Sequence, residues 1–285
     1  MAELTPPCSG DPAELRAKAK LYAGKVDALG ITDNQDGVRM AALAAAAVVA
    51  GEGVDPLLHI VTRDRNRTAL VADYLGAQAL GIHNVLCTSG THHALGPNRA
   101  SRAVFDLDSV QLLRTYAELG SDASVIGISR VEGTSPVCLG ATASPFADPV
   151  ELQVMRVAKK IDAGACFLVT QPVFDVDRFS TWWAQICARG LDGKACFVAG
   201  ILLLTSSSAA THHADQRPDP ALPPSVLERL TSSGDAKAQR VAGIEIAIDT
   251  VRRLRDISGL GGFCFRSEED DAAVLEVLSR AGLRS

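Results

Sequence analysis

Short apolar runs alternate with amphipathic stretches along nearly the whole chain. The apolar runs have the length and the punctuation of buried β-strands, and the stretches between them carry the spacing of helices. Strands are predicted at residues 26–32, 57–62, 84–89, 124–129, 165–171, 195–203 and 262–266. Helices are predicted at residues 12–25, 38–51, 67–80, 109–119, 149–163, 176–189, 236–257 and 268–281.

Repeated strand–helix units predict a parallel sheet covered by helices. The opening residues 1–4 supply a short eighth strand, and eight units favour a closed (β/α)8 barrel, a TIM barrel, over an open doubly wound sheet. The first loop also lacks the G-x-G-x-x-G pattern of a dinucleotide-binding unit. We therefore expect one barrel domain over residues 1–285, with one long irregular loop at residues 205–224.

Composition excludes several classes of function. The net charge of −5 gives no electrostatic case for binding nucleic acid, and no apolar run is long enough for a membrane span. The opening residues do not resemble a secretory signal. The seven cysteines form no C-x-x-C pair. We interpret Cys87, Cys166 and Cys196, which lie in apolar runs, as buried thiols of a cytoplasmic protein, and assign no metal site.

Polar residues gather where the predicted strands end, which is where barrel enzymes place their chemistry. They include Glu3, His59, Gln171, Arg266, the run Thr32-Asp33-Asn34, the run Thr62-Arg63-Asp64-Arg65-Asn66 and the run Thr88-Ser89-Gly90-Thr91-His92-His93. This set has few carboxylates, so it does not readily supply the acid pair of a glycosidase. It also shows no nucleophile with an evident partner base.

The third predicted strand ends in an unusual charged loop. Arg63 and Arg65 follow it, and Asp64 or Asn66 is placed to cap the next helix. Guanidinium groups beside a helix N-terminus suit a phosphate or carboxylate ligand. The alternative is that the arginines pair with Asp64 and Asp73 as a solvated rim. For His59, inside the same strand, a hydrogen-bonded core histidine and a ligand contact are both open.

Several passages resemble the methylenetetrahydrofolate reductase family, flavin-dependent barrels that make 5-methyltetrahydrofolate. The likeness is carried by Glu3-Leu-Thr-Pro-Pro7, Ile31-Thr32-Asp33-Asn34, His59-Ile-Val-Thr-Arg-Asp-Arg-Asn66, Leu80-Gly-Ile-His-Asn-Val-Leu86, Lys159-Lys-Ile-Asp-Ala-Gly-Ala165, Thr170-Gln171, Phe174-Asp175 and Ala199-Gly-Ile201. These passages span residues 3–201 in the family's order, and the helical stretch 243–254 looks similar too.

The resemblance implies roles for particular residues. Glu3 matches the family's acid at the pterin, which protonates the substrate and opens its one-carbon bridge. Gln171 matches the glutamine that contacts folate, and Thr91 and Arg266 are further candidates for the substrate. FAD is the implied cofactor. Its candidate contacts are Thr32, His59, Arg63, Arg65, Ser89, Gly90 and Lys160, the last beside the cofactor's phosphates.

The chain departs from the family pattern at three places. Gly90-Thr91 stands where the family usually has Gly-Asp, so a negative charge that favours the iminium cation is missing. Residues 202–205, Leu-Leu-Leu-Thr, replace a proline and an aromatic. Residues 139–145 are small and mostly apolar, without the tyrosine and histidine common there.

Two functions are consistent with these matches to the family and departures from it. One is a flavin-dependent reductase that passes hydride from NADH or NADPH to 5,10-methylenetetrahydrofolate. The other is a flavin-free barrel that binds tetrahydrofolate and transfers a methyl group to or from it, with a corrinoid protein as partner. A non-catalytic folate-binding subunit is a weaker alternative. We expect a homo-oligomer in the cytoplasm, although no motif gives the number of subunits or the choice of nucleotide.

Overall fold

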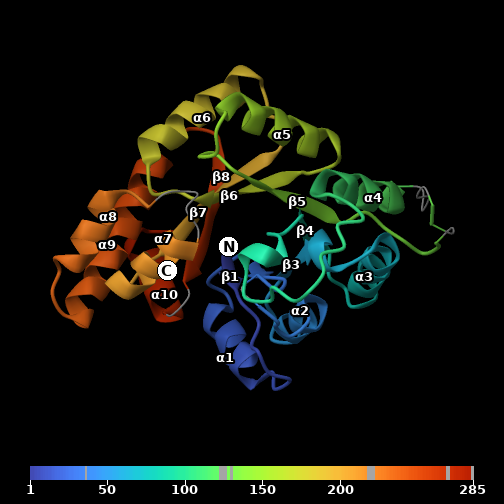
Figure 1. The fold of residues 1–285 in the computed structure, drawn as a ribbon, viewed down its shortest axis with the longest axis horizontal. Coiled ribbons are helices and arrows are strands. Elements are labelled where there is room, and N and C mark those ends of the chain that lie inside the picture. Colours follow the sequence, from blue (N-terminus) through green and yellow to red (C-terminus); the bar gives the residue numbers. More distant parts are fainter. Residues whose placement is uncertain (36, 122–126, 129–130, 217–221, 268–269, 284–285) are drawn as a thin grey trace. The chain divides into compact units, whose positions relative to one another are not determined.

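The computed structural model describes residues 1–35, 37–121, 127–128, 131–216, 222–267 and 270–283. Within these residues, the strands follow one another in chain order around a closed parallel barrel, β1-β2-β3-β4-β5-β6-β7-β8 (Figure 1). The predicted TIM barrel is therefore confirmed. The strands are β1 (Ala2–Leu4), β2 (Leu29–Ile31), β3 (Pro56–Val61), β4 (Asn84–Thr88), β5 (Cys138–Ala143), β6 (Phe167–Pro172), β7 (Cys196–Leu203) and β8 (Leu260–Ser267).

Helices follow nearly every strand. They are α1 (Ala13–Tyr22), α2 (Ala42–Ala50), α3 (Arg67–Ala79), α4 (Ser109–Ser121), α5 (Val150–Asp162), α6 (Val176–Ala188), α7 (Ser207–Gln216), α8 (Pro224–Thr231), α9 (Ala236–Arg255) and α10 (Asp271–Arg280). Single 3-10 turns follow β3 and β4, at Thr62–Asp64 and His93–Leu95. Across the described residues, every helix is too short or too polar to cross a bilayer.

The chain divides into two compact units, which are described separately. The N-terminal unit comprises Glu3–Thr142 and Ala158–Phe167. The C-terminal unit comprises Met1–Ala2, Ala143–Val157 and Leu168–Ser285. The expectation of one domain over residues 1–285 stays a prediction.

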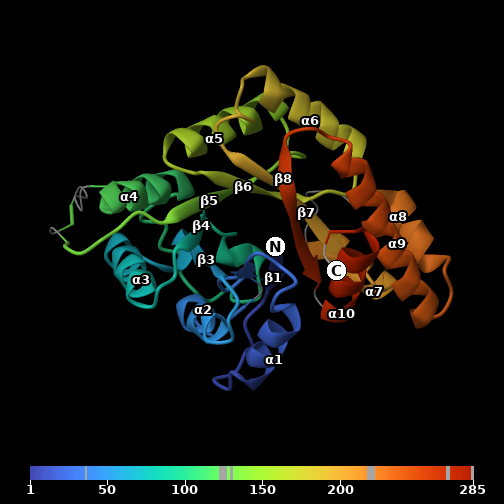
Figure 2. The ribbon, with the colours of Figure 1, turned by 180° about the vertical axis from the view of Figure 1, so that it is seen from behind.

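Parallel pairing organises the N-terminal unit. Gly30 pairs with Leu57 between β2 and β3, and Leu57 pairs in turn with Asn84 of β4. Every residue of β3 is buried, as expected for a strand covered on both faces. Helices α1, α2 and α3 lie outside β1–β4 in both views (Figures 1 and 2). Helix α2 is mostly alanine, and its small buried side chains suit close packing against β3.

Aromatic packing organises the C-terminal unit. Phe179, Trp182 and Trp183 of α6 are buried against Phe197 of β7, with the ring of Trp183 5.1 Å from that of Phe197. Strand β8 pairs with β7 over most of its length, with one register shift after Phe197. Large aromatic rings bury more apolar area than any other side chains, so this cluster fixes α6 on the strands.

The fifth strand lies at a different place from the prediction. Most of residues 124–129 falls outside the described residues, and the described Gly127 and Ile128 form a turn and a bend. Strand β5 instead takes Cys138–Ala143, most of which belongs to the small and mostly apolar stretch 139–145 that was expected to follow the fifth strand. The small side chains have a packing reason. A Cβ on Gly140 would lie 2.1 Å from the ring of Phe167, so this ring occupies the space a larger residue would need.

The predicted irregular loop at residues 205–224 is wrong over its first half, while its residues 217–221 lie outside the described residues. Helix α7 occupies Ser207–Gln216, and α8 begins at Pro224. Helix α7 has no apolar period to reveal it, because only its small Ala209 and Ala210 join the apolar cluster with Leu202 and Leu230. The prediction failed because small buried residues such as alanine do not produce a clear hydrophobic pattern in the sequence.

The cysteine prediction is only partly right. Cys87 of β4 is fully buried, as expected. Cys166 and Cys196 are exposed, which contradicts the prediction. Cys166 immediately precedes β6 and Cys196 is the first residue of β7, so both stand where the apolar run of a strand begins.

Candidate active site

An acid and a histidine meet in the N-terminal unit, on two strands that are separated by β2 in the barrel order. Glu3 of β1 and His59 of β3 face each other, with Glu3 Oε1 3.8 Å from His59 Nε2. Their side chains are 16% and 8% exposed, so the pair is largely buried while the carboxylate remains reachable. The separation exceeds a hydrogen bond and lies within ion-pair range, so a proton on His59 would make this a charged pair.

Backbone hydrogen bonds hold the short strand that carries Glu3. The Thr32 N–H donates to the Leu4 carbonyl at 3.1 Å. In the C-terminal unit, the Met1 nitrogen donates to the Phe263 carbonyl at 2.9 Å, and the Phe265 N–H donates to the Met1 carbonyl at 3.0 Å. Residues on either side of Glu3 are therefore anchored despite the three-residue length of β1.

Asp33 anchors Arg65 at the ends of β2 and β3. Its carboxylate accepts from the Val61 N–H at 3.0 Å and from Arg65 Nη1 and Nη2 at 2.5 and 3.2 Å. Arg65 Nε also lies 2.9 Å from Asp73 Oδ2, although these atoms are not aligned for a hydrogen bond. Burial raises the pKa of Asp73, and the charge of Arg65 opposes this rise only in part.

The guanidinium group of Arg63 also donates hydrogen bonds to groups of the protein. Arg63 is 5% exposed and donates to both carboxylate oxygens of Asp64 at 2.8 Å, to the Thr91 carbonyl at 3.1 Å and to the Asn34 carbonyl at 3.0 Å. His93 Nε2 lies 2.8 Å from Asp64 Oδ1. Burial favours the neutral acid, but the hydrogen bonds and charges of Arg63 and His93 outweigh it and lower the pKa of Asp64.

These contacts decide between the two interpretations of the charged loop. Arg63 and Arg65 pair with carboxylates of the protein, as the second interpretation proposed, rather than presenting open guanidinium groups. The helix cap is Asn66, whose Oδ1 accepts from the Ala69 N–H at 3.0 Å. The carboxylate of Asp64 instead accepts hydrogen bonds from Arg63. Sequence reasoning anticipated Asp64 and Asp73 as partners, but it missed Asp33 and His93.

The remaining predicted cofactor contacts of this unit also have internal roles. Ser89 Oγ accepts from the Ser109 N–H at 3.1 Å, at the start of α4. Lys160 Nζ donates to the Thr142 carbonyl at 2.6 Å, at the carboxyl end of β5. Gly90 has a φ of 79°, and a Cβ there would lie 2.5 Å from Val61 Cγ1. The space that a side chain at position 90 would occupy is therefore filled by the side chain of Val61.

Gln171 carries an orphaned acceptor in the C-terminal unit. Its Oε1 is buried and accepts no hydrogen bond from the residues that the structure describes. Its backbone lies close to β7, because a Cβ on Gly200 would be 2.5 Å from the Thr170 carbonyl oxygen. A buried amide oxygen without a donor is costly, so a ligand N–H at this position would be stabilised. Arg266 belongs to the same unit, on β8 opposite Leu202.

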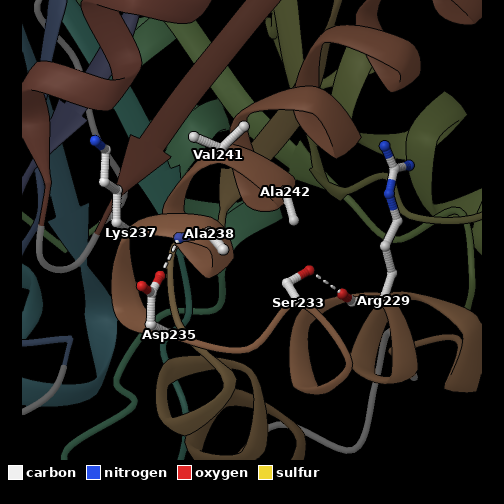
Figure 3. Close-up of a pocket in the computed structure, with 7 residues that line it drawn as sticks. All are labelled: Arg229, Ser233, Asp235, Lys237, Ala238, Val241 and Ala242. Atoms are coloured by element: carbon white, nitrogen blue, oxygen red, sulfur yellow. Dashed lines mark hydrogen bonds between the residues drawn. The ribbon is translucent and has the colours of Figure 1, made fainter.

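A surface hollow of about 490 Å³ lies elsewhere in the C-terminal unit, between α8 and α9 (Figure 3). It is lined by Arg229, Ser233, Asp235, Lys237, Ala238, Val241 and Ala242. Asp235 caps α9 by accepting from the Ala238 N–H at 2.8 Å, and Arg229 lies 3.3 Å from Asp249. None of the residues predicted from the sequence lines this hollow.

The family model for methylenetetrahydrofolate reductase matches residues 1–282. The chain belongs to this family. Similar proteins include methylenetetrahydrofolate reductase 1 of Schizosaccharomyces pombe, 25% identical over 81% of the chain and 36% of that protein. Another is 5,10-methylenetetrahydrofolate reductase of Salmonella typhimurium, 27% identical over 68% of the chain and 57% of that protein. The chain thus spans less than two thirds of the length of these family members.

The fold is shared with more distant proteins. A Clostridium thermocellum protein that binds two copies of 5-methyl-5,6,7,8-tetrahydrofolic acid matches with a TM-score of 0.64 at 10% identity, over 99% of the chain and 93% of its own. EDTA monooxygenase of Chelativorans sp. BNC1 matches with a TM-score of 0.59 at 10% identity, over 100% and 94%. At such identities the likeness concerns the fold alone.

Arg63 and Arg65 do not fit the phosphate-bearing part of the flavin that the family resemblance implies. Holding a pyrophosphate requires donors that are free to reach it. Arg63 and Arg65 are each paired with carboxylates, and the negative charge of Asp33, Asp64 and Asp73 would repel a phosphate. Among the predicted cofactor contacts, Thr32 keeps a buried hydroxyl without a hydrogen bond.

Proposed function

We propose that the chain reduces 5,10-methylenetetrahydrofolate to 5-methyltetrahydrofolate with hydride from a nicotinamide nucleotide. The observation that carries the proposal is the largely buried pair of Glu3 and His59, with 3.8 Å between Oε1 and Nε2. Glu3 stands at the position that matches the family's acid. The family match over residues 1–282 and the names of the relatives support the same chemistry.

The acid opens the one-carbon bridge of the substrate. The proton of the Glu3 carboxyl is transferred to the bridge nitrogen that leaves, the bond between this nitrogen and the bridging carbon breaks, and an iminium cation remains. A hydride from the nicotinamide nucleotide then adds to the iminium carbon and forms the methyl group. The resulting Glu3 carboxylate lies beside the ring of His59, and a proton taken up from water restores the acid.

Gln171 supports the binding of the folate in this proposal. Its orphaned Oε1 is an acceptor for an N–H on the edge of a pterin, and its amide N–H2 is a donor for the neighbouring ring nitrogen or carbonyl. A neutral amide provides both without adding a charge. The Clostridium thermocellum protein of the same fold binds 5-methyltetrahydrofolic acid, which supports a reduced folate as the ligand class.

The paired arginines favour a second candidate function. If no flavin binds, the same acid and amide suit methyl transfer to or from tetrahydrofolate, with a corrinoid protein as acceptor or donor. Protonation of the pterin nitrogen by Glu3 then activates the N-methyl group for attack by the reduced cobalt of the corrinoid, which forms the carbon–cobalt bond as the nitrogen–carbon bond breaks. This candidate needs the folate contacts but no hydride.

Replacing Glu3→Gln tests the proposal. The variant keeps the shape of the side chain but lacks its proton, so we expect turnover of methylenetetrahydrofolate with NADH or NADPH to fall by about 100-fold or more. Nucleotide consumption is measured with and without added FAD. The matched control is Glu14→Gln, an exposed residue of α1, which should retain full turnover.

Full turnover by Glu3→Gln would remove Glu3 as the proton donor. A wild-type protein that consumes neither nucleotide under any of these conditions would contradict the reductase proposal. If it instead transfers a methyl group from 5-methyltetrahydrofolate to free reduced cobalamin, the second candidate function replaces the first.

A further inference from the structure

Two cysteine thiols touch in the N-terminal unit, away from the residues of the candidate active site. Cys138 begins β5, and Cys166 immediately precedes β6. Their sulfur atoms are 3.2 Å apart, neither is part of a disulfide, and both residues are exposed. The sequence separates them by 28 positions, so their contact is produced by the fold.

The backbone holds the two thiols together. The Cys138 N–H donates to the His83 carbonyl at 2.7 Å, which fixes the start of β5 beside β4. The Cys166 N–H donates to the Leu139 carbonyl at 2.8 Å, which fixes the approach to β6 beside β5. Neighbouring strands lie about 4.8 Å apart, within the range that a disulfide spans. A bond of about 2.05 Å requires the sulfur atoms to approach by roughly 1 Å, within reach of side-chain rotation.

The electrostatic environment makes Cys166 the more reactive thiol. The hydrogen bond from Cys138 lowers the pKa of Cys166 to about 7, and a contact with the Leu139 carbonyl at 3.1 Å accompanies it. The thiolate is the reactive form of cysteine, so Cys166 is partly activated near neutral pH. The thiols of Cys87 and Cys187 lack this activation. Burial raises the pKa of Cys87, and burial and the nearby Asp192 raise the pKa of Cys187.

We propose that Cys138 and Cys166 are a redox-active thiol pair, which hydrogen peroxide oxidises to an intramolecular disulfide. The site lies at the amino ends of β5 and β6, whereas Thr142, which receives the hydrogen bond of Lys160, lies at the carboxyl end of β5. In barrels of this class the amino ends of the strands serve stability rather than catalysis. The inference is independent of the proposed reductase activity.

The oxidation proceeds in two steps. The Cys166 thiolate attacks one oxygen of hydrogen peroxide, an S–O bond forms, the O–O bond breaks, and the departing hydroxide takes up a proton as water. Cys138, deprotonated, then attacks the sulfur of the Cys166 sulfenic acid. The S–S bond forms, the S–O bond breaks, and a second hydroxide leaves and is protonated. Two thiols lose two electrons in total, and the peroxide is reduced to two waters.

The test uses the full-length protein, reduced and then treated with one equivalent of hydrogen peroxide. Remaining thiols are alkylated without reduction, and the digested chain is analysed by mass spectrometry. We expect a cross-linked peptide pair that contains Cys138 and Cys166, and a fall from seven to five titratable thiols in denaturant. Because the bond closes a loop of about 30 residues, Tm should rise by about 5 °C.

Single variants assign the two roles. Cys138→Ser should form no disulfide, and its Cys166 should be trapped as a sulfenic acid by dimedone. Cys166→Ser should leave Cys138 as slow to react as an ordinary exposed thiol. The matched control, Cys187→Ser, should form the disulfide at the wild-type rate, since Cys187 is exposed but not part of the pair.

Three results would overturn the proposal. One is equal alkylation of Cys138 and Cys166 before and after peroxide. Another is a cross-link only between separate chains. The third is oxidation of Cys166 in the wild type no faster than that of Cys187.

Discussion

At the scale of single residues, the position of Asp33 explains how a strongly charged loop is tolerated beside a buried strand. The Asp33 side chain is inaccessible to solvent, and its partner Arg65 is 19% exposed. A buried carboxylate without a partner would cost several kcal/mol, so the backbone N–H of Val61 and the Arg65 guanidinium are both required to satisfy it. The pair is therefore better understood as part of the framework than as a ligand contact.

Replacing Asp33→Asn should destabilise the protein strongly. The amide keeps the shape but removes the charge, and Arg65 is then left partly buried without its main counter-ion. We expect the free energy of unfolding to fall by about 3 kcal/mol, measured by urea denaturation. Asp249→Asn is the control, because the pair of Asp249 and Arg229 is about half exposed and should contribute at most about 0.5 kcal/mol. Equal losses in both variants would show that burial does not set the value of the Asp33 pair.

Residues near the site differ in how far the sequence reveals them. The pairing of Arg63 with Asp64 was one of two interpretations of the sequence, and Asn66 was one of two candidate helix caps, because both contacts join near neighbours in the chain. The contact between Asp33 and Arg65 joins residues 32 positions apart, and Arg63 reaches the carbonyl of Thr91 across 28. Contacts between residues so far apart in the sequence depend on strand register, which is set by packing in the folded chain.

At the scale of elements, α9 shows how a helix approaches the strands. Gly243 lies inside this helix, where glycine costs about 1 kcal/mol relative to alanine. Glycine stands at this position because the Cβ of any other residue would lie 2.1 Å from the Leu204 carbonyl oxygen, just after β7. The missing side chain allows helix and backbone to meet at close range, and this contact outweighs the loss of helix propensity.

Gly243→Ala should therefore destabilise the protein although alanine is the better helix former. We expect a loss of about 2 kcal/mol in the free energy of unfolding, because the obstructing atom is a backbone oxygen and the whole helix must shift. Thermal denaturation followed by circular dichroism measures it. Gly193→Ala is the comparison, since no atom lies within 4 Å of its Cβ position and a change within about 0.5 kcal/mol is expected. A stabilised Gly243→Ala variant would mean that helix propensity dominates.

Two of the elements that the sequence missed share one cause. Strand β5 and helix α7 are built from small residues, such as Gly140, Ala141, Ala209 and Ala210, whose burial leaves little trace in a hydrophobic pattern. The ring of Phe167 fills the space above Gly140, which replaces the bulky side chain that a strand pattern normally shows. Elements with Leu, Val, Ile or aromatic residues, such as β3 and α6, were placed within a few residues.

At the scale of the whole molecule, family membership and the details of the charged residues point in different directions. The family match extends over residues 1–282, so the chain as a whole has the family's fold. Arg63 and Arg65, two of the residues expected to contact a flavin, are paired with carboxylates of the chain itself. The fold is therefore that of the family, while the pairing of Arg63 and Arg65 argues against their use as flavin contacts.

The purified protein should contain flavin at well below one molecule per chain. A phosphate-bearing flavin would have to compete with Asp33, Asp64 and Asp73 for the same guanidinium groups and would be repelled by their charge. The absorbance spectrum of the supernatant after heat denaturation measures the content. One flavin per chain, retained through purification, would contradict this expectation and would require contacts from other residues.

The sequence alone determined the barrel, the positions of most helices and the family, because these depend on the local period of apolar residues and on short runs of the chain. Tertiary structure decided which charges pair, that Gln171 keeps an acceptor without a donor, and that the thiols of Cys138 and Cys166 touch. The physical reason is the separation along the sequence of the residues that are in contact. Periodicity reports whether a side chain is buried, whereas a contact of about 3 Å between distant positions depends on strand register and packing that no local pattern encodes.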